Sequence, residues 1–230
     1  LEPPARPTDR LGPTGGWTHL VTFAAPTVLD PTDPRTRAGL GLDAAGAAAL
    51  ADCEVTLVRT SDGPDASCTN LYAASAGVPV VGVGPGFVDR GGFRFTAVAR
   101  PATNPWTLLD RPTDAAGPVP AVLDAATAQW AMKVGGVGAR FSLPDGAGRP
   151  AEFEIVGLLD LSILQGVVLV AEREFERLFP ARSGAGLALV DAGRVVAAAG
   201  AEPTVRRALE DAWIDAGPEV TATQQRLARL

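Results

Sequence analysis

The order in which helix and strand patterns follow one another constrains the fold of this chain most. Residues 17–24 and 54–60 show the loose alternation of apolar and polar side chains that is typical of strands. Between them, residues 43–52 are rich in alanine, and Asp43 is placed to cap a short helix. The first 60 residues therefore predict a strand, a helix and a second strand.

The C-terminal part repeats this order and contains the clearest helix pattern, over residues 202–216. Pro203 suits the first turn of that helix and Gly217 its end. Its apolar stripe, which we expect to lie in the core, consists of Val205, Leu209, Ala212, Trp213 and Ala216. Residues 166–171, 186–191 and 220–222 predict strands, and residues 172–179 predict another helix that ends before Pro180.

The middle of the chain predicts mainly strands and loops. Strand patterns cover residues 78–83, 93–99, 139–143 and 152–159, with one short helix at 124–132 and Trp106 as the anchor of a long loop. A turn-rich break at 61–70 marks a domain boundary. We therefore predict an α+β fold with a linker over 1–16, a discontinuous α/β base subdomain over 17–62 and 165–230, and a β-rich subdomain over 63–164 inserted into it.

Composition excludes some classes of partner. The chain has 230 residues, 47% of them hydrophobic, which suffices for a sizeable core. Its net charge of −6 repels phosphate backbones, so nucleic acid is not expected as a partner. The most apolar run, residues 158–171, is shorter than a membrane span and contains Asp160 and Gln165. Residues 1–13 do not resemble a signal peptide, and we expect the chain to be a soluble piece of a longer protein.

Side chains suited to catalysis are scarce. His19 is the only histidine, it lies in a predicted strand, and no G-x-S-x-G nucleophile motif is present, so we expect a surface or half-buried histidine. One histidine and two widely spaced cysteines match no zinc-binding spacing. The sequence therefore predicts no catalytic residue, no metal and no cofactor, and we expect that the protein is not an enzyme.

A glycine-rich turn supports an alternative interpretation. Gly82, Gly84 and Gly86 follow a predicted strand, as in a phosphate-binding turn. However, Pro85 interrupts them and residues 88–93 show no amphipathic helix pattern, so we expect a turn between two strands. The Gly82–Gly86 turn remains the best feature of the alternative hypothesis, a free-standing small-ligand-binding or enzymatic α/β domain.

Cys53 and Cys68 are the two cysteines. They can form a disulfide if the domain is extracytoplasmic, or they can be two unpaired, partly buried thiols. Their spacing alone does not decide between these alternatives, because a disulfide depends on the distance between the two Cα atoms.

Several segments, taken in order, resemble the extracytoplasmic, MacB-like periplasmic core of FtsX-like ABC transporter permeases. They are DASCTNLY at 65–72, RGGFRF at 90–95, NPWTLL at 104–109, and the runs at 120–143, 152–180 and 186–191. The resemblance implies a membrane-proximal, porter-like α/β base with an inserted, sabre-like β-rich subdomain, and it carries no catalytic residue to any position of this chain.

The same resemblance implies a function and a location. The chain would lie on the extracytoplasmic side of the cell membrane, between the first two transmembrane helices of a permease. A cytoplasmic ATPase and a second permease subunit are the expected partners, and an envelope protein or lipoprotein can be a partner or substrate. The expected role is to relay transmembrane-helix motion during export or extraction of a lipoprotein, peptide or small toxic molecule. A third hypothesis is an interaction module of an envelope protein unrelated to transport.

Overall fold

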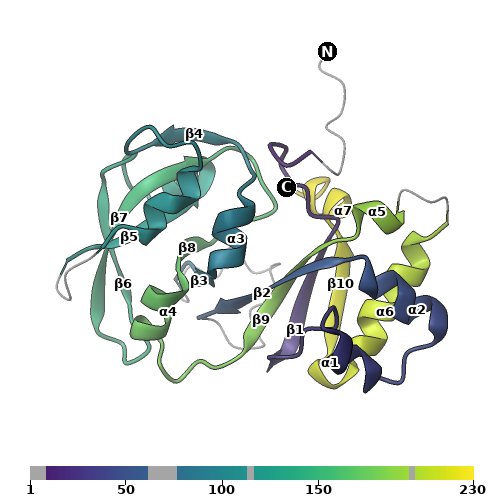
Figure 1. The fold of residues 1–230 in the computed structure, drawn as a ribbon. Coiled ribbons are helices and arrows are strands. Elements are labelled where there is room, and N and C mark those ends of the chain that lie inside the picture. The colour runs from purple at the N-terminus through teal and green to yellow at the C-terminus, as the bar shows by residue number, and fades with distance from the viewer. Residues whose placement is uncertain (1–8, 62–76, 113–116, 197–199) are drawn as a thin grey trace, which may run out of the picture.

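The computed structural model describes residues 9–61, 77–112, 117–196 and 200–230. These residues form helices and one large mixed sheet (Figure 1), which confirms the predicted α+β class. The strand order is β10-β1-β9-β2-β3-β8-β5-β7-β4, and β6 pairs with β7 beside β4.

The bounds of the elements are as follows. The strands are β1 (His19–Thr27), β2 (Glu54–Thr60), β3 (Val80–Val83), β4 (Phe95–Val98), β5 (Val119–Asp124), β6 (Arg140–Pro144), β7 (Pro150–Leu159), β8 (Val168–Ala171), β9 (Ala185–Asp191) and β10 (Pro218–Ala222). The α-helices are α1 (Pro34–Ala38), α2 (Ala44–Ala51), α3 (Pro85–Arg90), α4 (Glu172–Leu178), α5 (Gly193–Val196), α6 (Glu202–Ala212) and α7 (Thr223–Leu227). Short helical turns of other types are η1 (Pro105–Asp110), η2 (Thr127–Ala131) and η3 (Ile214–Ala216).

Strands β10, β1, β9 and β2 form one antiparallel half of the sheet, which with α1, α2, α5, α6 and α7 we call the base. Helices α2 and α6 cover one face of it (Figure 1). Val21, Val190, Leu50, Leu209 and Trp213 meet in the core between these helices and the sheet. The predicted apolar stripe of α6 is therefore core, as its 3.6-residue period required.

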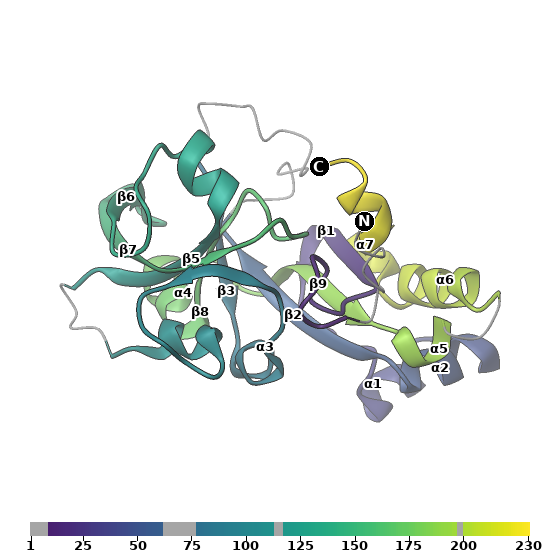
Figure 2. The same ribbon diagram turned by 90° about the horizontal axis from the view of Figure 1, so that it is seen from above.

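The remaining strands, with α3 and α4, form what we call the central half, residues 77–178. Seen from above (Figure 2), the central half lies beside the base, and β2 and β3 connect the two. That connection is narrow, because β2 and β3 pair at only two positions, Arg59↔Gly82 and Thr60↔Val81. An apolar cluster shared by both halves reinforces the connection: Trp17, Leu20 and Leu189 pack with Phe87 and Trp106.

One part of the chain lies with a different half than predicted. Strand β8 pairs with β3 and with β5, and α4 packs on β3, so residues 168–178 belong to the central half. The prediction assigned everything from residue 165 onward to the base. A continuous apolar run indicates a buried strand but does not identify its neighbours. Elsewhere the division into base and inserted subdomain stays a prediction.

Helix ends were predicted well where a capping residue marks them. Asp43 accepts a hydrogen bond from the Gly46 amide at 2.6 Å, and α2 begins at the next residue, as expected. The long C-terminal pattern is realised as α6 followed by η3, and Gly217 ends it in the left-handed conformation with a φ of 60°.

The glycine-rich turn was predicted wrongly in one respect. Instead of a turn between two strands, Gly84 precedes α3, whose first turn contains Pro85. The helix has six residues and ends at Gly91, where φ is 65°. Six residues are too few for an apolar period of 3.6 to be recognised.

None of the helices within the described ranges has both the length and the apolar character needed to cross a membrane.

Candidate functional site

The segment before β1 is packed rather than extended into solvent. Residues 12 and 14–16 are buried, so the predicted linker over 1–16 is wrong for this part of it. Two tight turns form it: the Gly12 amide donates to Asp9 O and the Gly15 amide to Gly12 O, both at 3.0 Å. Proline and glycine are common to linkers and tight turns alike, so composition did not distinguish them.

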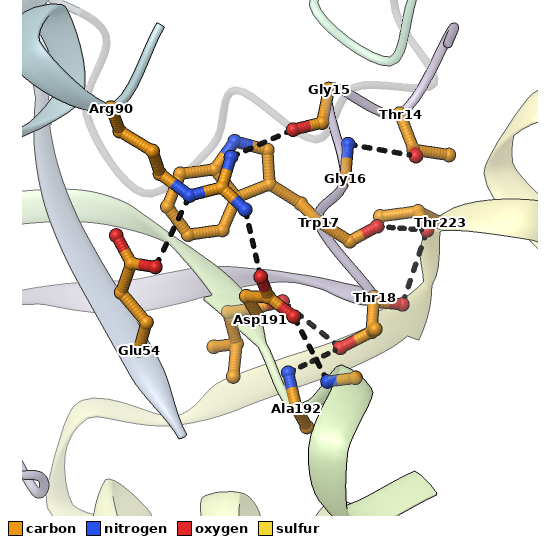
Figure 3. A network of polar contacts seen from close by, with 12 residues as sticks. Thr14, Gly15, Gly16, Trp17, Thr18, Glu54, Arg90, Asp191, Ala192 and Thr223 are labelled. Atoms are coloured by element: carbon orange, nitrogen blue, oxygen red, sulfur yellow. Dashed lines mark hydrogen bonds and ion pairs between the residues drawn. The ribbon is translucent and has the colours of Figure 1, made fainter. Parts of the chain in front are cut away.

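Arg90 connects this segment with both halves of the molecule (Figure 3). It is the last residue of α3, and its side chain is only 3% exposed. The guanidinium donates to Gly15 O at 2.7 Å, to Asp191 Oδ2 at 2.8 Å and to Glu54 Oε2 at 3.3 Å. One side chain of the central half thus contacts β2, β9 and the segment that precedes β1.

The Trp17 indole lies directly beneath this guanidinium. The Arg90 Cζ atom is 3.7 Å from the centroid of the Trp17 ring, and the tryptophan is fully buried. An aromatic face attracts a cation at this distance, and the attraction is stronger where water is excluded. Trp17 therefore stabilises the Arg90 guanidinium at the face of its plane, whereas the hydrogen-bond acceptors of Arg90 contact its N–H groups.

The C-terminal end of the fold meets the same segment. Thr223, fully buried at the start of α7, donates its amide to Thr18 O at 2.9 Å, and its hydroxyl lies 2.7 Å from Trp17 O. The Thr18 hydroxyl in turn donates to Val190 O and accepts from the Ala192 amide, both at 3.0 Å. Two parts of the chain that are more than 200 positions apart are therefore held together at one end of β9.

Both ends also contact the central half. The Phe93 amide donates to Arg10 O at 2.6 Å, and the Ile163 amide donates to Pro13 O at 3.0 Å. From α7, Arg226 Nε donates to Ile163 O at 2.9 Å. We take this network as the candidate functional site. Sequence reasoning missed it, because nothing in the pattern distinguishes Arg90 from an exposed arginine.

His19 is buried, contrary to the prediction of a surface or half-buried histidine. It is 1% exposed, with Nδ1 at 2.9 Å from the Thr18 hydroxyl and Nε2 at 3.7 Å from Glu202 Oε1. Burial lowers the pKa of His19 below its usual 6.5, although the nearby Glu202 carboxylate acts in the opposite direction. A hydrogen bond from Arg206 lowers the pKa of Glu202.

This pKa shift predicts a loss of stability in mild acid. The unfolded chain binds a proton at His19 at higher pH than the folded chain does, so the free energy of unfolding should fall as pH decreases below about 6.5. One titrating group limits the slope to about 1.4 kcal/mol per pH unit. We expect His19→Gln to flatten this dependence in urea denaturation between pH 7.5 and 5. Parallel curves for the two proteins would contradict the prediction.

The glycines of the 82–86 turn are explained by different neighbours. A Cβ atom at Gly82 would lie 2.6 Å from Phe175 Cβ, so this glycine lets α4 approach β3 closely. A Cβ atom at Gly84 would lie 3.0 Å from Glu172 Oε2, and a carboxylate at this place disfavours an anionic ligand. Nothing lies within 4 Å of the same position at Gly86.

We therefore expect opposite results from two alanine substitutions in this turn. Gly82→Ala overpacks the contact with Phe175 and should lower the free energy of unfolding by about 1–3 kcal/mol. Gly86→Ala, the matched control within α3, should leave it unchanged or raise it by up to about 1 kcal/mol. Urea denaturation measures both changes in the free energy of unfolding. Equal changes would show that the close packing of α4 on β3 does not require glycine at position 82.

Cys53 follows α2 and is partly buried. Its Sγ atom donates to Ala49 O at 3.2 Å. Burial, followed by the charges of Asp191 and Asp52, raises the pKa of the Cys53 thiol to about 11. Cys68 lies outside the described residues, so a disulfide between Cys53 and Cys68 stays a prediction.

Across the part of the chain that the structure describes, no group of three or more histidine, cysteine, aspartate or glutamate side chains is arranged to hold a metal ion.

No protein family and no curated protein match the sequence. Among solved structures, the chain is similar to the periplasmic region of MacB from Actinobacillus actinomycetemcomitans. The similarity covers 90% of each chain, with 14% sequence identity and a TM-score of 0.44.

Proposed function

We propose that this chain is a non-enzymatic extracytoplasmic domain of a bacterial ABC transporter permease of the FtsX-like, MacB-like class. Its role would be to relay the motion of transmembrane helices to a substrate or partner. The ordered series of segments described above supports the class, and the base with its β-rich neighbouring half agrees with the expected architecture.

The adjacency of the two described ends carries this proposal. Strands β1 and β10 are antiparallel, with His19 opposite Ala222, so β1 begins where β10 ends. Thr223 then bonds to Trp17 and Thr18, so the start of α7 lies against the segment that precedes β1. Membrane helices attached to the two ends would therefore approach the domain from the same side, which suits a domain set between two transmembrane helices.

A relay also needs a body that does not deform when one end is moved. The base has a close-packed core between its sheet and α2 and α6, with Trp213 only 2% exposed. The shared cluster around Trp17 and Trp106 extends this packing into the central half. A displacement of the two ends of the chain would thus be transmitted through this packing to the surface of the central half.

The proposed partners follow from the same class of protein. They are a cytoplasmic ATPase that acts through the membrane part, a second permease subunit, and an envelope protein or lipoprotein. A lipoprotein, a peptide and a small toxic molecule all remain candidate substrates.

Cysteine accessibility in the full-length parent protein tests the proposed location. Cys53 and Cys68 would be changed to serine, and the exposed Glu210 of α6 to cysteine. A membrane-impermeant maleimide added to intact cells should label this cysteine, and the parent protein should co-purify with an ATPase. A cytoplasmic protein with one exposed cysteine is the control and should be labelled only after lysis.

If the Glu210→Cys protein were also labelled only after lysis, the proposal would be wrong. A parent reading frame that encodes no hydrophobic span would equally overturn it.

A further inference from the structure

We propose that residues 10–18 act as a coupling strap and that Arg90 is its latch, so that both halves of the domain and both of its ends move as one body. This inference rests on the proposed function in one respect only, namely that transmembrane helices supply the motion. The coupling itself is argued from contacts within the chain and can be tested without a membrane.

The strap is bonded to the base at its C-terminal end. Thr18 bonds to β9 and the residue after it through Val190 and Ala192, and Trp17 and Thr18 accept from Thr223. Trp17 itself is fully buried in the cluster that both halves share. A displacement of the strap is therefore transmitted to β1, β9 and α7 through these hydrogen bonds.

The N-terminal part of the strap is bonded to the central half instead. Arg10 O accepts from Phe93, Pro13 O from Ile163, and Gly15 O from Arg90. Gly15 lies so close to the Phe93 ring that a methyl group in its place would overlap the ring, and its φ of 61° already favours glycine. Three separate positions of the central half thus contact one short segment.

This cross-linking matters because the sheet joins the halves weakly. Two residue pairs connect β2 to β3, and two hydrogen bonds between Ser61 and Val80 extend this pairing by one position. The ion pairs of Arg59 with Glu172 and Glu176 nearby are partly exposed. Arg90 differs, because its buried guanidinium contacts the strap, β2 and β9 at once. The guanidinium uses a different nitrogen atom for each of these acceptors, in a fixed planar fork, whereas a lysine ammonium carries all of its donors on one nitrogen atom and cannot reproduce that spread.

Distances between spin labels test the coupling in the isolated chain. In a protein with Cys53→Ser and Cys68→Ser, labels are placed at Ala147→Cys in the β6–β7 turn and at Glu210→Cys on α6, two exposed positions in different halves. We expect one narrow distance distribution. Arg90→Lys should broaden and shift it, and so should Gly15→Ala, which displaces the strap from Phe93 while Arg90 remains.

Each variant has a matched control. Arg94→Lys changes an exposed arginine close to Arg90. Gly41→Ala changes a glycine with a similar φ of 65° but with nothing within 4 Å of its Cβ position. Both controls should retain the narrow distribution.

Hydrogen exchange provides a second measurement. The Phe93 and Ile163 amides donate to strap carbonyls, so both should exchange about tenfold faster or more in the Arg90→Lys protein, while amides within β7 stay protected. If Arg90→Lys did not fold, Gly15→Ala alone would decide. The wild-type distance distribution together with unchanged exchange in Gly15→Ala would overturn the proposal. Because no membrane is involved, that result would leave the proposed function untouched, and a failed labelling experiment would leave the coupling untouched.

Discussion

Trp213→Ala is expected to lower the free energy of unfolding by about 3–5 kcal/mol. The Trp213 ring is 2% exposed and meets Phe23 edge-on, with 5.0 Å between the ring centroids. Its Nε1 atom donates to Leu29 O at 2.8 Å, so the indole also connects α6 to the loop after β1. Truncation would leave a cavity between α6 and the sheet and would remove the donor of that hydrogen bond.

The neighbouring residue is a suitable control for this prediction. Ile214 follows Trp213 directly but is 70% exposed, so Ile214→Ala should change the free energy of unfolding by no more than about 0.5 kcal/mol. Urea denaturation of the two variants beside the wild type measures the difference. Similar small effects for both would show that the α6 stripe does not hold the base together.

Arg90→Met is expected to cost about 3 kcal/mol of stability. The substitution keeps part of the side-chain volume but removes all three hydrogen bonds, and it leaves Gly15 O and Asp191 without the guanidinium. It also removes the cation from the face of Trp17. Glu54, whose side chain is 48% exposed, can be solvated instead, so we expect most of the loss to arise at Gly15 and Asp191.

Arg94→Met provides the comparison, because Arg94 is exposed and lies four positions further along the chain. It should change the free energy of unfolding by no more than about 0.5 kcal/mol. Chemical denaturation at low and high salt adds a second check: the difference between the two variants should persist at high salt, because buried charges are screened little. A loss that disappeared in high salt would mean that Arg90 acts only through long-range charge.

Local signals account for the parts of the fold that were predicted correctly. Alternation predicted β2 over Glu54–Thr60 with the bounds that the structure has. The Asp43 cap and the Gly217 stop each act through hydrogen bonds to residues close by in the chain, so they could be recognised from a short stretch of sequence.

Errors arose where a residue's environment depends on distant segments. The sequence around His19 has a strand pattern, which does not reveal how deeply the side chain is buried. Glu202 approaches His19, and Val220 in β10 pairs with β1, only after the chain has folded. The segment at residues 12–16 has the composition of a linker, but contacts with Arg90, Phe93 and Ile163 bury it. No signal in the segment itself could have predicted this burial.

The sequence by itself determined most of the longer strands and helices, where the marked helices start and stop, and that the fold is α+β, but it did not predict α3, α7 or β5. These properties depend on side-chain period and on hydrogen bonds across three or four residues, which are present in any short stretch of the chain. Only the tertiary structure decided that β8 joins the central half, that the two ends meet at β9, and that Arg90 connects them to both halves. Those outcomes depend on which surfaces bury each other, and that choice is made by the whole chain at once, across separations of more than 200 residues.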